Sequence, residues 1–203
     1  MRNNIPIPRW ALWLMPSIIV RKSPDEKVLY LSFDDGPRPE TTGKILEILH
    51  RYQAKASFFC TGTMVNKHPD LLEKIRCGGH SIGNHGMYHK KQGLFGYKKF
   101  ISETDVAARL LKSRLFRPPY GFITPGVYRK LRQRYDIVLW DVMPGDFIDA
   151  RDAASMMETV KLSVRNGSII VLHEKFQNSH NTLELLEIIL RHYTALGFRF
   201  EGL

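Results

Sequence analysis

Short apolar runs alternate with longer amphipathic stretches along the chain from residue 27 onward. The apolar runs are rich in β-branched and aromatic residues, and most are bounded by Gly, Pro, Asn or Asp, a pattern typical of strands. They predict seven strands, at residues 28–33, 56–60, 80–84, 115–117, 136–141, 168–172 and 198–200.

The stretches between these runs carry apolar residues every three or four positions, as amphipathic helices do. In the first of them, Ile45, Leu46, Ile48 and Leu49 supply the apolar face. Helices are expected at residues 41–52, 69–76, 97–112, 125–134, 153–164 and 181–196. Regular alternation of strand and helix predicts an α/β fold with a parallel sheet and right-handed crossovers, either closed into a barrel or left open.

With 203 residues, 43% of them hydrophobic, the chain is long enough for one sizeable core and short for two. We expect one domain over residues 23–203, preceded by an arm of residues 1–22. The arm holds an apolar segment of eleven residues, Trp10 to Val20, which Pro16 interrupts and no small-residue cleavage site follows. Because roughly 20 apolar residues are needed to span a bilayer, this arm is expected to pack on the domain or lie on a membrane surface.

The formal net charge of +10, from 30 Lys and Arg against 20 Asp and Glu, raises the question of a polyanionic partner. The basic residues are scattered, as at Lys90-Lys91 and Lys98-Lys99, and form no nucleic-acid motif. We therefore expect a solvated basic face and no nucleic-acid partner. Cys60 and Cys77 make neither a disulfide framework nor a metal-ligand pair, and both are expected to be buried free thiols.

Polar side chains gather where the predicted strands end. In chain order, these clusters are Asp34 and Asp35; His85 and His89; Arg117, Pro118, Pro119 and Tyr120; Trp140, Asp141 and Asp146; and His173 and Glu174. Because the C-terminal ends of parallel strands converge, we expect the clusters to surround one cleft.

Asp34 and Asp35 stand between the first strand and the turn at Gly36-Pro37. Side chains alternate along a strand, so adjacent carboxylates can take different environments, one holding a metal ion and the other moving a proton. The alternative is that both acids only open the turn, which Asp favours through its own side-chain hydrogen bonds.

His85 and His89 are four residues apart, a spacing that puts two imidazoles on one side of a helical turn. Two histidines and a carboxylate, with one position open for water, form a common catalytic zinc arrangement. The histidine pair alone also fits surface or core packing, but the acids after the first strand favour a metal site. His80, on the way into this loop, is expected to be a packed structural histidine.

Two further residues, at the ends of later predicted strands, suit catalytic roles. Arg117 precedes Pro118-Pro119 in a stiff segment, where its guanidinium could fix a carboxylate by a bidentate hydrogen bond. His173 ends an apolar strand, where it could protonate a leaving group while Asp146 holds its other ring nitrogen and raises its pKa. The alternative for His173 is a core histidine that caps the strand.

Taken together, residues 27–201 resemble the polysaccharide deacetylases of the NodB-homology type, carbohydrate esterase family 4. Five segments carry the resemblance in the family's motif order: Phe33-Asp34-Asp35-Gly36-Pro37, Asn84 to His89, Arg117-Pro118-Pro119-Tyr120-Gly121, Trp140 to Phe147, and Val171-Leu172-His173.

The resemblance implies a distorted (β/α) barrel of about seven parallel strands, and it implies roles for individual residues. Asp34, oriented by Arg117, would be the catalytic base, and His173, tuned by Asp146, the acid. The backbone N–H of Tyr120 would help to bind the oxyanion.

The resemblance also implies a metal site and a substrate surface. The implied ligands of a divalent ion, zinc first and Co²⁺, Mn²⁺ or Ni²⁺ as alternatives, are Asp35, His85 and His89. The implied substrate-binding residues are Trp140, Phe147, Val171 and Pro119.

Three positions depart from the family's usual pattern. Gly86 replaces a Ser or Thr, which is expected to remove a hydrogen bond that braces the loop. Phe147 replaces a tryptophan, which narrows the aromatic wall available to a sugar ring, and Val171 stands where a leucine commonly lines the acetyl pocket.

The implied function is a metal-dependent hydrolase, acting as a monomer, that removes an N-acetyl or similar small N-acyl group from an amino-sugar polymer or oligomer such as peptidoglycan or chitooligosaccharide. One alternative is a deformylase or deacylase of a nucleotide- or lipid-linked amino sugar, which the positive charge would suit. Another is a non-catalytic metal- or glycan-binding module. Because no cleavable signal is visible, we expect a cytoplasmic or peripherally membrane-associated protein.

Overall fold

The structure, a computed structural model, describes residues 13–92, 96–148, 151–174 and 179–203. The strands are β1 (Val28–Asp34), β2 (Ala56–Cys60), β3 (Ser81–Asn84), β4 (Leu115–Phe116), β5 (Asp136–Ile137), β6 (Ile169–His173) and β7 (Arg199–Phe200). The helices are α2 (Thr42–Arg51), α3 (Gly62–Lys67), α4 (Pro69–Cys77), α5 (Tyr97–Leu111), α6 (Pro125–Leu131), α7 (Ala153–Ser163) and α8 (Ser179–Ala195), with a 3-10 turn η1 (Pro119–Gly121).

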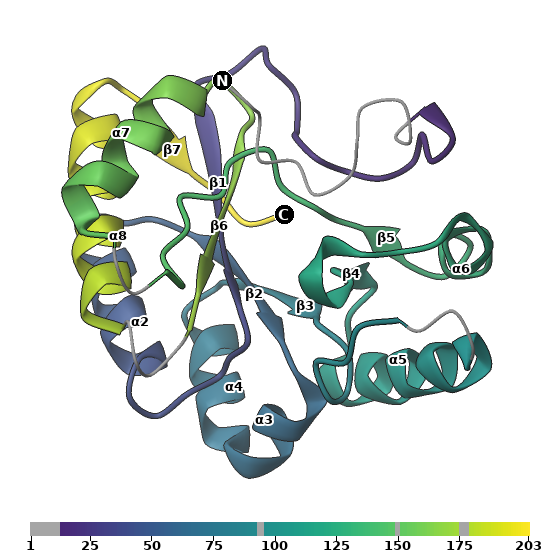
Figure 1. The fold of residues 1–203 in the computed structure, drawn as a ribbon. Coiled ribbons are helices and arrows are strands. Elements are labelled where there is room, and N and C mark those ends of the chain that lie inside the picture. Colours follow the sequence, from purple (N-terminus) through teal and green to yellow (C-terminus); the bar gives the residue numbers. More distant parts are fainter. Residues whose placement is uncertain (1–12, 93–95, 149–150, 175–178) are drawn as a thin grey trace.

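The strands form one parallel sheet in the order β5-β4-β3-β2-β1-β6, with β7 paired to the start of β1. The sheet curls into a half-barrel, and the helices lie around its outside (Figure 1). The expected distorted (β/α) barrel of parallel strands is confirmed.

Both faces of the sheet are buried, as the continuous apolar runs predict for parallel strands. On β6, Ile170 and Leu172 pack into a cluster with α2, α7 and α8, whereas Ile169 and Val171 pack into a second cluster inside the curl. This alternation fixes where the next residues point. His173 continues the inner row and Glu174 the row that faces the helices.

The described part of the N-terminal arm completes the barrel wall. Ile19 forms a parallel bridge with Val138, and Arg21 an antiparallel bridge with Ser168, so the segment joins the β5 edge to the start of β6. Met15 and Ile18 are buried in the inner cluster. This explains why β5 is shorter than the predicted strand 136–141: beyond Ile137 the chain pairs with single residues of the arm and of β6 rather than with one continuous strand.

Some local expectations are wrong. Helix α3 was not predicted, because its six residues are too few to show an amphipathic period. Cys60 is buried as expected, but Cys77, in the last turn of α4, is exposed.

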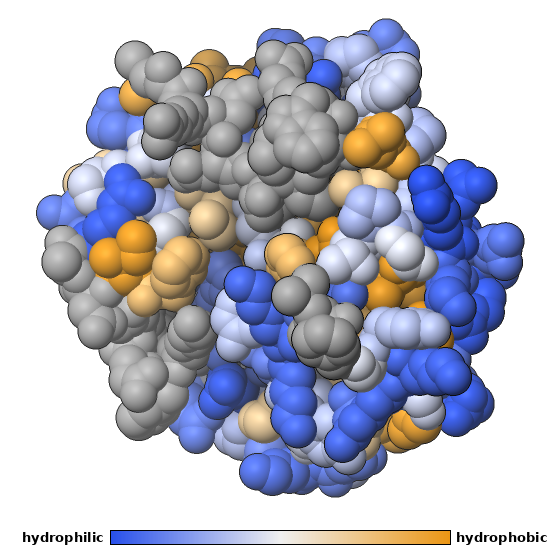
Figure 2. All heavy atoms as spheres, turned by 45° about the vertical axis from the view of Figure 1, so that its right-hand side comes forward, coloured by the Kyte–Doolittle hydropathy of each residue, from blue (hydrophilic) through white to orange (hydrophobic). Residues whose placement is uncertain are grey.

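The surface agrees with a solvated exterior. On the face shown in Figure 2, hydrophilic side chains cover most of the coloured surface and the apolar ones form small separate groups. Within the described segments, no helix is both long and apolar enough to cross a bilayer. Trp13 and Leu14 are 82% and 51% exposed, so contact of the arm with a membrane surface stays a prediction, and residues 1–12 lie outside the described part of the chain.

Replacing Ile18 by Ala should lower the free energy of unfolding by about 2–4 kcal/mol, because it opens a cavity where the arm packs into the inner cluster. The control is Trp13→Ala at an exposed position of the same arm, which should change stability by less than about 0.5 kcal/mol. Urea denaturation of both variants measures the difference. If Ile18→Ala and Trp13→Ala unfold with the same free energy, the arm is not part of the folded barrel.

Candidate active site

The site is built around a carboxylate at the end of β1. Asp34 is 2% exposed, and its Oδ1 accepts a hydrogen bond of 2.6 Å from the Arg117 guanidinium. Burial alone would raise the pKa of the Asp34 carboxyl, but the charges of Arg117, His85 and His173 outweigh it and hold this pKa below its ordinary value. Asp34 is therefore ionised and fixed in place.

Arg117 is completely buried and is held on every side. Its guanidinium lies 3.9 Å from the ring centroid of Phe59, and its nitrogens donate to the Ser32 hydroxyl and to the carbonyls of Val138 and Leu139. The expected bidentate pair is wrong in this detail. A single nitrogen contacts both Asp34 and Ser32, because the others are committed to the backbone beyond β5.

Asp35, His85 and His89 converge beside this pair. One potential ligand atom from each lies within 4.8 Å of the others, the only such metal-type group in the described segments. Asp35 Oδ1 is buried and receives no hydrogen bond from the described residues, although His89 Nε2 is 3.1 Å away and His85 Nε2 3.7 Å. A buried, unsatisfied carboxylate oxygen facing two imidazole nitrogens fits a divalent transition metal such as zinc.

The orientation of His85 also fits a ligand. Its Nδ1 lies 2.8 Å from the carbonyl oxygen of Arg117, which can only accept, so Nδ1 carries the hydrogen. In the neutral ring this leaves the lone pair on Nε2, the atom that faces Asp35.

The loop that carries the two histidines is not helical, which corrects the expectation drawn from their spacing. Gly86 and His89 have φ values of 80° and 51°, so left-handed residues, rather than a helical turn, bring the rings to 5.0 Å between centroids. Glycine has no side chain to brace the loop, but the backbone N–H of Gly86 donates to the side-chain oxygen of buried Asn84 at 2.8 Å.

Opposite this group, His173 is held by Asp146. His173 Nδ1 lies 2.9 Å from Asp146 Oδ1, while Oδ2 accepts from the His173 backbone N–H at 2.6 Å and from the Thr182 hydroxyl. Burial would lower the pKa of His173, but the hydrogen bond and charge of Asp146, with the charges of Asp34 and Asp35, raise it above its ordinary value. Asp34 and His173 are register partners on β1 and β6, so the two groups face the same cleft.

The expected substrate-binding residues lie in different surroundings. The Phe147 ring packs edge-on against His173 with centroids 5.0 Å apart. The exposed ring of Tyr120, the expected oxyanion donor, lies 4.7 Å from that of His89. Pro119, Trp140 and Val171 are buried beneath the site, with Trp140 against the Arg117 guanidinium.

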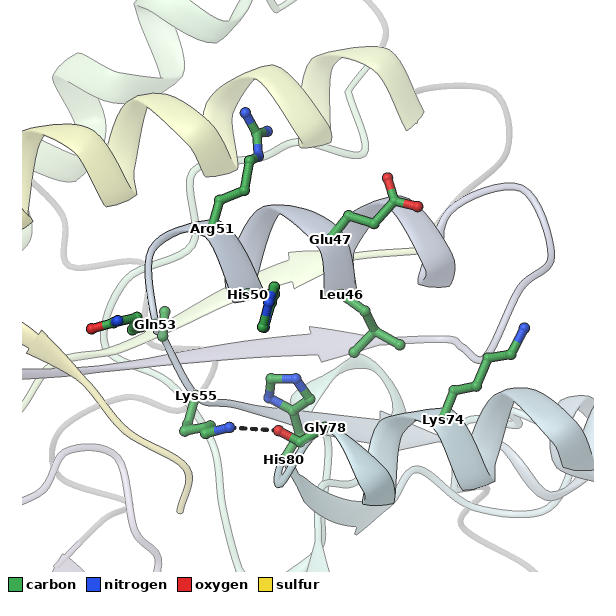
Figure 3. Close-up of a pocket in the computed structure, with 10 residues that line it drawn as sticks. Leu46, Glu47, His50, Arg51, Gln53, Lys55, Lys74, Gly78 and His80 are labelled. Atoms are coloured by element: carbon green, nitrogen blue, oxygen red, sulfur yellow. Dashed lines mark hydrogen bonds between the residues drawn. The ribbon is translucent and has the colours of Figure 1, made fainter.

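A surface hollow of about 710 Å³ lies away from this group, between α2 and α4 (Figure 3). Two of its basic groups are already paired: Lys55 Nζ donates to the Gly78 carbonyl at 2.6 Å and Arg51 pairs with Glu187 at 3.1 Å. His80 accepts from the Ala56 N–H, and burial with the charge of Lys55 lowers its pKa to about 4. His80 is thus the packed histidine expected, and since Lys55 and His80 precede β2 and β3, this hollow is at the opposite end of the strands.

Sequence reasoning assigned no role to Ser32, Asn84 or Glu174, which are all completely buried beside the site. The burial of Ser32 and Asn84 inside predicted strands was the available signal, because a buried polar side chain needs hydrogen-bond partners. For Glu174, the signal was an acid directly after an apolar strand.

Comparison with known proteins agrees with this geometry. The family described as polysaccharide deacetylase matches residues 21–137. A peptidoglycan-N-acetylglucosamine deacetylase of Bacillus cereus is 29% identical over 98% of this chain and 94% of its own length. A chitooligosaccharide deacetylase of Bradyrhizobium is 31% identical over 73% of this chain and 71% of its own.

Among solved structures, the Bc1960 peptidoglycan N-acetylglucosamine deacetylase superimposes with a TM-score of 0.86 at 28% identity, over 97% of this chain and 95% of that one. The relatives support deacetylation of amino-sugar polymers, and deacetylases of this family depend on a metal ion. The chain belongs to the polysaccharide deacetylases of carbohydrate esterase family 4, hydrolases that cleave amide bonds.

Proposed function

We propose that this enzyme removes the N-acetyl group from amino sugars of a peptidoglycan or chitooligosaccharide chain, with zinc held by Asp35, His85 and His89. The observation that carries the proposal is the meeting of an ionised, arginine-fixed carboxylate with a His-His-Asp group on one side of the cleft and a carboxylate-held histidine on the other. These are the groups that hydrolysis of an unactivated amide needs: a base, a metal site and an acid.

Asp34 is the proposed base. Its Oδ2 lies 3.8 Å from His85 Nε2, so the carboxylate borders the proposed metal site without sharing the Asp35 position. Because Arg117 fixes Oδ1, Oδ2 remains directed toward the cleft and can take a proton from the attacking water. When bound, zinc supplies Lewis-acid polarisation of the amide oxygen and lowers the pKa of a water molecule.

His173 is the proposed acid, and Asp146 its positioning residue. Since Nδ1 faces the Asp146 carboxylate, the other ring nitrogen is left to deliver a proton to the departing amine. Asp146 keeps the imidazole in this orientation and favours its protonated form. The Phe147 ring against His173 shields this side of the cleft from water.

The Tyr120 backbone N–H is the proposed donor to the oxyanion. The contact of its ring with His89 supports this assignment, because it holds the Tyr120 backbone at the rim of the proposed metal site.

Chelation should abolish acetate release from an N-acetylglucosamine oligomer, and added zinc should restore it. The reason is that the proposed reaction depends on the ion held by Asp35, His85 and His89. Acetate is measured for the protein as prepared, after chelation, and after zinc is restored. A peptidoglycan glycan assayed in parallel distinguishes the two polymers. Release that survives complete removal of metal would contradict the proposal.

Asp34→Asn should lower kcat by about 10²–10⁴-fold while zinc still binds, because the amide keeps the shape and loses the basic oxygen. Isothermal titration of zinc into the metal-free variant and steady-state kinetics measure the two effects separately. Near-normal turnover of this variant would remove Asp34 from the role of base.

Asp146→Asn should move the alkaline limb of kcat/KM to lower pH. His173 must be protonated to act as an acid, so activity is present below its pKa and is lost as pH rises through it. Without the Asp146 charge this pKa falls, and the loss begins earlier. Thr182→Val, which removes a hydroxyl donor to Asp146 but leaves the carboxylate, is the control and should leave the limb in place. An unmoved limb in Asp146→Asn would separate Asp146 from the titration.

A further inference from the structure

A second acid lies directly behind the site. Glu174 follows His173 at the end of β6 and points to the opposite face, where it is completely buried. Its backbone N–H donates to the carbonyl of Asp34 at 2.9 Å, which continues the pairing of β6 with β1. Glu174 is thereby tied by its main chain to both proposed proton-transfer residues.

The side chain of Glu174 reaches the start of α2. Its Oε2 accepts hydrogen bonds from the hydroxyls of Thr41, at 3.1 Å, and Thr42, and the Thr42 hydroxyl accepts from the Arg38 N–H at 2.7 Å. These contacts hold the segment that follows Gly36-Pro37 against the end of β6. The loop from Asp34 to Thr42 is thus held at both ends by one residue.

The other carboxyl oxygen, Oε1, has no hydrogen-bond partner among the described residues and lies against Gly36. A Cβ at position 36 would be 1.9 Å from Oε1 and 2.6 Å from Cδ of Glu174. Gly36 is not among the residues with left-handed φ, so the position demands glycine for space and not for backbone conformation. The hydrogen bonds from Thr41 and Thr42 oppose movement of the carboxyl, so displacing it would break them.

Such a group is costly to bury. Burial raises the pKa of Glu174 to about 7, against the opposing hydrogen bonds from Thr42 and Thr41 and the charge of Arg38. An apolar side chain in this position would avoid the desolvation penalty, so the acid is better explained by what it holds in place than by stability.

We propose that Glu174 is a positioning residue for the reaction: packed against Gly36 and bonded to Thr41 and Thr42, its carboxyl sets the position of the Asp34-Asp35 loop relative to His173. This role rests on the proposed function, because it matters only if these residues act together on one amide. It requires the shape and the acceptor oxygen of the side chain, which glutamine shares, more than its charge.

Four variants test the contact: Glu174→Ala, Glu174→Gln, Gly36→Ala, and Glu174→Ala combined with Gly36→Ala. Glu187→Ala, an acid in an exposed ion pair on α8, is the control and should behave as the unmodified enzyme. For each protein, kcat and KM are measured on the N-acetylglucosamine oligomer with saturating zinc, zinc affinity is measured by titration of the metal-free form, and the melting temperature is measured without metal.

Glu174→Ala should lower kcat and zinc affinity by about 10–100-fold each, with KM within about 3-fold, as for residues that orient metal ligands. Gly36→Ala should do the same by displacing the carboxyl, and the double variant should be no worse than Glu174→Ala alone, because the collision partner is already gone. Glu174→Gln should keep kcat and zinc affinity within about 3-fold. At pH 8 it should have a higher melting temperature than the unmodified protein, because glutamine does not carry the buried negative charge that Glu174 has at this pH.

Unchanged kcat and zinc affinity in Glu174→Ala, or additive losses in the double variant, would overturn the positioning role. If Glu174→Ala does not fold, Glu174→Gln and Gly36→Ala still test the role, since a Gly36→Ala enzyme with normal kcat and zinc affinity would overturn it. An unmodified enzyme that releases no acetate with zinc bound would instead overturn the proposed function, and the positioning role with it.

Discussion

The buried ion pair between Arg117 and Asp34 constrains everything around it. A guanidinium that is shielded from solvent must donate its hydrogen bonds to protein oxygens. Here the acceptor oxygens belong to β1 and to the chain beyond β5. The rings of Phe59 and Trp140 pack against the guanidinium. Removing one member of a buried pair leaves an uncompensated charge that costs about 3–5 kcal/mol. The strand ends therefore cannot shift independently, and the remaining site residues are attached to a rigid frame.

The period-two geometry of strands distributes the chemistry over this frame. On β1, Asp34 belongs to the inner row, while Phe33 belongs to the row that faces the helices. On β6, His173 and Glu174 divide in the same way. The adjacent residues His173 and Glu174 thus lie on opposite faces of the sheet. His173 faces the cleft, and Glu174 contacts the loop that follows β1.

The sequence predicted the strands, the fold class and the clustering of polar residues at strand ends, because these depend on local periodicity and on the convergence of parallel strands. It did not predict the conformation of the loop from His85 to His89. An i, i+4 spacing is typical of a helical turn, but this loop contains residues with left-handed φ and is not helical. The closure of the barrel by the arm and the contact of Glu174 with Gly36 were also out of reach, because each joins segments far apart in the chain without any periodic signal.

The arm that closes the barrel wall has a consequence for folding kinetics. The Ser17 hydroxyl meets that of Tyr128, 111 positions along the chain, and Arg21 pairs with Ser168. Contacts between such distant segments require closure of a long loop before they bring any stability. During synthesis, the first described residues of the chain must therefore wait for the sixth strand to emerge, and the barrel seam should be among the last parts of the molecule to form.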